Sequence, residues 1–120
     1  MSDYQMGPIE SKFADLIWEN EPITSSELAK RGEKLFFWKK STTYTVLKRL
    51  CDKGIFQNQK GIVTSLISRE ELYSVQSERF VEENFNGSLP AFIAAFAAKR
   101  ARPPDEVAEL RRMVDEYGEG

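Results

Sequence analysis

The stretch WKKSTTYTVLKRLCDKG, residues 38–54, decides how this chain folds. Its apolar positions share the spacing of one helical face: Thr43, Val46, Leu47 and Leu50. The pattern predicts an amphipathic helix over 41–53, with Ser41 as its cap and Gly54 as its stop. The opposite face carries hydroxyls, a tyrosine and cations, and this composition needs an explanation.

Two further helices are predicted before this stretch. The first runs from Pro8 to about Asn20, because Pro suits a first helical turn and Pro22 prevents continuation. Ile23 then lies in a very short extended segment. The sequence TSSE at 24–27 has the form of a capping box and starts a second helix, with Leu28 and Leu35 facing inward. A loop over 36–38 leads into the third helix.

After Gly54 the period of the apolar residues changes from that of a helix to that of a strand. Two short runs, 55–59 and 62–67, are separated by Lys60-Gly61, which suits a hairpin turn. Residues 1–68 therefore predict a winged helix-turn-helix domain, mainly α with a small β-hairpin wing.

Residues 69–120 predict three more helices and form a second region. They hold too few large apolar residues for a core of their own, because a segment of ~50 residues buries proportionally little surface. A symmetric homodimer would cover their apolar stripes, and folding back onto the N-terminal domain is the alternative. The expected interface residues of this helical dimerisation region are Leu72, Phe80, Leu89, Phe92, Ile93, Phe96, Leu110 and Val114.

The composition excludes most enzyme chemistry. The chain of 120 residues has no histidine and a single cysteine, Cys51, which we interpret as a small packing residue. No Ser-His-Asp, Cys-His or typical zinc site can be built from these residues, so we expect no catalytic site, metal or cofactor. There is no secretion signal and no apolar run near the ~18 residues of a membrane span, so a cytoplasmic protein without membrane insertion is expected.

The positive charge is confined to one third of the chain. Net charge is −2 overall, yet residues 28–60 hold nine cations and two acids, a net charge of +7. A local basic patch is the electrostatic footprint of phosphate binding. A solvated face balanced by neighbouring acids is the alternative.

The hydroxyls and cations of the opening stretch fit a recognition helix. In a helix-turn-helix, the second helix lies in the major groove of double-stranded DNA with its N-terminal residues at base edges. Hydroxyls and Tyr44 suit base edges, whereas the cations suit phosphates. The expected DNA-binding residues are Lys39, Lys40, Ser41, Thr42, Tyr44, Thr45, Lys48, Arg49 and, in the wing, Lys60.

Three segments together resemble the penicillinase-repressor family of winged-helix proteins. They are FADLIWENEPITSSELAK at 13–30, STTYTVLKRLCDKGIF at 41–56 and FVEENFNGSLPAFIAAF at 80–96. The middle segment matches the family pattern at Thr42, Thr45, Leu47, Arg49, Leu50, Lys53 and Gly54. The resemblance implies a homodimeric repressor that binds an inverted-repeat operator, and a sensor protease that acts on the C-terminal region.

The chain departs from the family pattern in three places. The tail RRMVDEYGEG lacks the cysteines of copper-responsive members. The wing GIVTSLIS, 61–68, lacks the usual cation, which raises the alternative of a protein-interaction module that has lost DNA binding. The family's cleaved Asn-Phe bond aligns with Ala95-Phe96, so the asparagine is missing and the inducing signal stays open.

Overall fold

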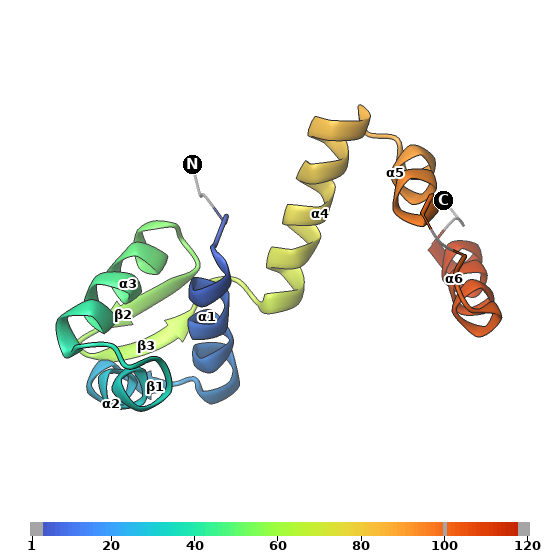
Figure 1. Ribbon diagram of the computed structural model, residues 1–120. Helices are drawn as coiled ribbons and strands as arrows, with labels where there is room; N and C mark the ends of the chain where they lie inside the picture. Colours follow the sequence, from blue (N-terminus) through green and yellow to red (C-terminus); the bar gives the residue numbers. More distant parts are fainter. Residues whose placement is uncertain (1–3, 100, 118–120) are drawn as a thin grey trace. The chain divides into compact units, whose positions relative to one another are not determined.

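The chain forms six helices and three short strands within the residues that the structure describes. This computed structural model describes residues 4–99 and 101–117. The first part contains α1 (Pro8–Asn20), β1 (Ile23–Thr24), α2 (Ser25–Phe36), α3 (Lys40–Asp52), β2 (Phe56–Gln59) and β3 (Ile62–Ser65) (Figure 1). The second part contains α4 (Arg69–Phe85), α5 (Leu89–Ala97) and α6 (Pro104–Tyr117).

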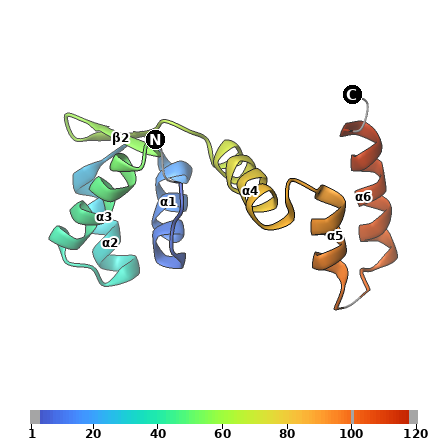
Figure 2. The ribbon, with the colours of Figure 1, turned by 90° about the horizontal axis from the view of Figure 1, so that it is seen from above.

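The strands form one antiparallel sheet in the order β1-β3-β2. Val63 of β3 pairs with Ile23 on one side and with Asn58 on the other. Lys60 and Gly61 both have positive φ, 54° and 85°, as a tight hairpin turn requires. Figure 2 shows this hairpin on one side of α1, α2 and α3. The arrangement is a winged helix-turn-helix, which confirms the predicted fold class.

A single apolar core holds the first part together. It is built from every predicted element of the domain, with Phe13 and Ile17 from α1, Leu28 from α2 and Leu50 from α3. Leu72, at the start of α4, joins this core and is fully buried within its own chain. The prediction that Leu72 lies in the dimer interface is therefore wrong, because its side chain already packs inside one protomer.

Polar contacts also join the start of α4, and the residues just before it, to α1. Arg69 Nε lies 3.1 Å from Asp15 Oδ1, and its guanidinium lies over the Trp18 ring at 5.5 Å. Trp18 Nε1 donates a hydrogen bond of 3.1 Å to the Ile67 carbonyl. The chain accordingly divides into two compact units within α4, Met1–Ser77 and Glu78–Gly120.

Helix limits agree with the sequence pattern at most ends. Thr24 caps α2 by accepting from the Glu27 N–H at 3.1 Å, and Gly54, with φ 83°, follows the end of α3. Two details differ. The residue before α3 is Lys39 rather than Ser41, because the helix already begins at Lys40. Leu35 is 55% exposed, since α2 turns Leu28, Ala29 and Gly32 toward the core instead.

Gly32 lets α2 and α3 approach closely. A Cβ at this position would overlap the Thr43 hydroxyl oxygen and lie 3.5 Å from the Thr43 Cβ and Cγ2. Thr43 is fully buried and its hydroxyl has no hydrogen-bond partner among the described residues.

We expect Gly32→Ala to destabilise the protein although alanine is the better helix former. Alanine favours the helix over glycine by about 1 kcal/mol, whereas overpacking a buried contact costs about 1–3 kcal/mol. Urea denaturation measures the free energy of unfolding of each variant. Adding Thr43→Ala should restore part of the loss, because it removes the overlapping hydroxyl; a single Gly32→Ala variant as stable as the parent would contradict the close approach.

The unit Glu78–Gly120 has a different character from the first. Neither α5 nor α6 contains a buried residue. Its aromatic rings contact one another in a row, with centroids 6.1 Å apart for Phe80 and Phe92 and 6.0 Å for Phe92 and Phe96. Asn86 and Gly87 have positive φ, and Ser88 caps α5 by accepting from the Ala91 N–H at 3.1 Å, as the sequence predicts.

Candidate nucleic-acid interface

The outward face of α3 carries most of the residues expected to bind DNA. Its inward positions, Thr43, Val46, Leu47 and Leu50, pack into the core and fix which side faces solvent. Tyr44 is half-buried, and the remaining candidates on and just before the helix are exposed: Lys39, Lys40, Ser41, Thr42, Thr45, Lys48 and Arg49. The helical period therefore places these side chains on one surface.

The start of α3 differs from the starts of its neighbours. Side-chain oxygens accept from backbone N–H groups at the starts of α1, α2, α4 and α5, through Glu10, Thr24, Ser68 and Ser88. The residue before α3, Lys39, supplies no such bond, and the first turn of α3 has no acidic residue. Cations at a helix N-terminus oppose the helix dipole, so this end suits an external anion.

The cations of α3 fall into two groups by their partners. Lys48 Nζ lies 3.1 Å from Asp52 Oδ2, and Arg49 Nη1 lies 3.7 Å from Glu10 Oε2. Within the described part of the chain, no carboxylate pairs with Lys39 or Lys40, although Lys40 Nζ lies 5.8 Å from the centre of the Tyr44 ring. To bind a DNA phosphate, Lys48 and Arg49 must first give up a carboxylate partner, whereas Lys39 and Lys40 need not.

Thr45 already uses its hydroxyl proton within the helix. Its Oγ1 donates a 2.9 Å hydrogen bond to the Ser41 carbonyl, one turn earlier. This leaves lone pairs on the oxygen and the methyl group for an outside partner. The methyl group is therefore the part of Thr45 best suited to contact a base edge, such as a thymine methyl.

A hollow of about 340 Å³ separates α3 from the hairpin. It is lined by Tyr44, Leu47, Lys48 and Cys51 of α3 and by Asn58 of β2. Burial raises the pKa of the Cys51 thiol, nearby Asp52 raises it further and Lys48 lowers it, so the thiol stays protonated at neutral pH. Cys51 thus behaves as a packing residue rather than as a reactive thiolate.

The hairpin offers one cation at its tip. Lys60 is exposed, and the Asn58 side chain accepts from the Gly61 N–H at 3.0 Å and so holds the turn. Gln57 and Thr64 bond across the strands at 3.1 Å. Ile62 and Leu66 are exposed, so the hairpin presents apolar side chains beside its single cation.

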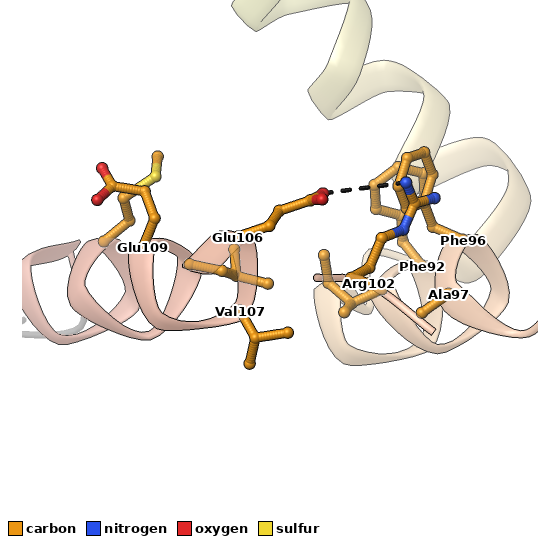
Figure 3. A pocket seen from close by; sticks show the side chains of 10 residues that line it. Phe92, Phe96, Ala97, Arg102, Glu106, Val107 and Glu109 are labelled. Carbon is orange, nitrogen blue, oxygen red and sulfur yellow. Dashed lines mark ion pairs between the residues drawn. The ribbon is translucent and has the colours of Figure 1, made fainter. Parts of the chain in front are cut away.

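The unit Glu78–Gly120 exposes the apolar residues expected in a dimer interface. Phe80, Leu89, Phe96, Leu110 and Val114 are all exposed in the single chain, and Phe92 and Ile93 are half-buried. A hollow of about 340 Å³ lies between α5 and α6 (Figure 3). Arg102 crosses its rim, with its guanidinium 4.4 Å from the Phe96 ring centre and 3.9 Å from Glu106.

Two features of the candidate DNA-binding surface were missed by sequence reasoning. Glu10 pairs with Arg49 and Lys53, a contact between residues far apart in sequence that no local pattern reveals. Phe37 is 91% exposed in the turn between α2 and α3. The sequence did contain a signal for Phe37. Glycine is the usual residue directly after a helix, so a phenylalanine at this position is unusual and could have been singled out.

Within residues 4–99 and 101–117, no cluster of three or more potential metal ligands is present. None of the helices described there has the length and apolar character that crossing a membrane would require.

Comparison with known proteins agrees with this architecture. The family model described as penicillinase repressor matches residues 6–116, which is nearly the whole chain. The chain is also 26% identical, over 117 residues, to the penicillinase repressor of Bacillus licheniformis, covering 94% of this chain and 91% of that protein. The match spans both the winged helix and the C-terminal helices. The chain belongs to the penicillinase repressor family.

Proposed function

We propose that the protein is a homodimeric transcriptional repressor that binds double-stranded operator DNA, with α3 in the major groove. The observation that carries the proposal is the uncapped start of α3. Among the described residues no carboxylate pairs with Lys39 or Lys40 there, and the exposed hydroxyls of Ser41 and Thr42 lie beside them. A DNA phosphate would satisfy both the free N–H groups and the lysines.

The proposed dimerisation through the C-terminal helices rests on their exposed apolar side chains. The exposed apolar residues of α5 and α6 need a partner, and a second copy of the chain supplies the same surface by symmetry. A two-fold dimer presents two copies of α3, which corresponds to an operator with two inverted half-sites. Leu72 takes no part in this proposed interface.

A second function is favoured by the hairpin. Exposed Ile62 and Leu66 beside a single cation suit a protein surface better than a phosphate backbone. The alternative is therefore a winged-helix module that binds another protein and no longer binds DNA.

Direct binding measurements separate the two functions. A gel-shift assay uses the promoter of the chain's own operon and a random duplex of equal length. The repressor predicts tighter binding to the promoter, with affinity that falls steeply as salt rises. An absence of binding to either duplex at low salt would favour the interaction module.

A sensor protease as inducer would have to cleave a helix. The aligned bond, Ala95-Phe96, lies within α5 and not in a loop. Proteases cleave exposed loops more readily than helices, and the asparagine of the family's cleavage bond is missing. If cleavage occurs here, α5 must first unfold locally.

A further inference from the structure

Phe37 combines two unfavourable properties. Its ring is 91% exposed, more than any other large apolar side chain described. Its backbone has φ 58° and ψ 32°, the left-handed region that a phenylalanine rarely adopts. Strain in a residue whose ring is almost fully exposed suggests a contact absent from the free protein.

The neighbours of Phe37 fix the turn without using its ring. The Phe37 N–H donates to the Glu33 carbonyl and the Trp38 N–H to the Gly32 carbonyl, both at 3.2 Å. Trp38 packs inward, with its ring 5.3 Å from Phe13 and 4.9 Å from Phe36. Any residue that tolerates the left-handed conformation would make the same two backbone bonds, so the fold does not require the ring.

The position of Phe37 connects it to the proposed DNA surface. Lys39 is two residues away, so its Cα lies within about 7 Å of that of Phe37. Phe37 therefore adjoins the uncapped, lysine-flanked start of α3, where a duplex would approach. Bases and sugars at a groove edge present apolar atoms, including the thymine methyl, to which a phenylalanine ring can bind.

We infer that Phe37 is a DNA-contacting residue whose ring packs against apolar atoms of the duplex at the start of α3. The inference rests on the proposed repressor function and adds an apolar contact to it. The occupant is double-stranded DNA because the flanking charges are positive and the surface continues that of α3.

Phe37→Asn tests the inference without disturbing the turn. Asparagine tolerates the left-handed conformation and keeps both backbone bonds, so the midpoint of urea unfolding should stay the same or rise. Affinity for the promoter duplex should fall on the order of tenfold or more, because burial of the ring against DNA is lost in both protomers. A variant that gains stability and loses binding has lost a contact with the ligand and not a fold contact.

The matched control is Tyr73→Ala, which removes another exposed aromatic ring from the same unit, away from α3. It should bind the duplex like the parent. Replacing single thymines by uracils in the duplex separates the two apolar partners of the ring. If Phe37 contacts a thymine methyl, one such change weakens binding of the parent but not of Phe37→Asn; if it contacts a sugar, every such change affects the parent and Phe37→Asn equally.

Two results are distinguishable failures. If the parent binds DNA and Phe37→Asn binds equally well, Phe37 is not in the interface and the inference is overturned alone. If the parent binds neither duplex, the repressor function fails and the inference fails with it.

Discussion

Leu89→Asp is expected to convert the proposed homodimer into monomers at micromolar concentration. In the single chain Leu89 is 56% exposed, so an aspartate there is solvated and the fold of the protomer is undisturbed. In the proposed interface the carboxylate is buried without a partner, which costs about 3–5 kcal/mol, and symmetry places it there twice. Sedimentation velocity over a range of concentrations gives the mass directly.

The control is Leu35→Asp. Leu35 is 55% exposed, nearly the same as Leu89, but it lies on α2 in the other unit. This variant should remain dimeric, and circular dichroism should show the same helix content for both. If Leu89→Asp also stays dimeric with full helix content, Leu89 is outside the interface.

Phe92→Asp should dissociate the dimer too, but it is less diagnostic. Phe92 packs against Phe80, Phe85 and Phe96 within its own chain, with ring centroids 5.7–6.1 Å apart. A charge there disrupts the protomer as well as the interface, so loss of the dimer would have two explanations. Leu89 has only one.

The elements of the fold could be read from the sequence because each has a local signal. Pro8, the TSSE box at 24–27, Gly54 and Gly61 each mark an end or a turn, and the structure places an end or a turn at all four. The outward face of α3 followed from the spacing of its apolar residues alone. These signals are local, so they survive without knowledge of tertiary contacts.

The errors in burial and in pairing depend on tertiary contacts. Leu72 has the spacing of a surface stripe on α4, but the end of the hairpin brings it back onto the core of the first unit. Leu35 lies two turns after Leu28, yet it is 55% exposed at the end of α2, where the face with Leu28, Ala29 and Gly32 is the one turned to the core. The pairing of Arg49 with Glu10 joins α3 to α1 and leaves no trace in either segment.

Variants of α3 should divide into two classes of DNA-binding behaviour. Thr45→Ala or Tyr44→Ala should lower the ratio of operator affinity to random-DNA affinity, because these side chains lie where base edges are expected. One lost base contact is worth about 1–3 kcal/mol, and a dimer loses two. Binding isotherms on both duplexes give the ratio.

The internal hydrogen bond of Thr45 sharpens this expectation. Because its hydroxyl donates to the Ser41 carbonyl, the methyl group is the expected reader. Thr45→Val, which keeps the methyl group, should retain more of the affinity ratio than Thr45→Ser, which keeps the hydroxyl. If Thr45→Ser retains more of the affinity ratio than Thr45→Val, the hydroxyl and not the methyl group contacts the base. If the ratio is unchanged in both variants, Thr45 does not contact a base.

The lysines should behave differently, since charge carries no sequence information. Lys39→Ala or Lys40→Ala should weaken binding to both duplexes equally and lower the slope of log affinity against log salt by about 0.9 per phosphate contact, doubled in the dimer. Lys48→Ala and Arg49→Ala should act in the same direction. Their effect on affinity should be smaller, because Asp52 and Glu10 already compete for these cations.

Lys12→Ala removes an exposed lysine from α1 and is the matched control, with no expected change in salt slope beyond a weak general effect. The comparison between Lys40 and Lys48 is the most informative. Both are exposed lysines on one helix, but in the part of the chain that the structure describes Lys48 has a carboxylate partner and Lys40 has none. A larger loss from Lys48→Ala than from Lys40→Ala would mean that phosphates pass along the middle of α3, so the uncapped start would lose its role as the anion site.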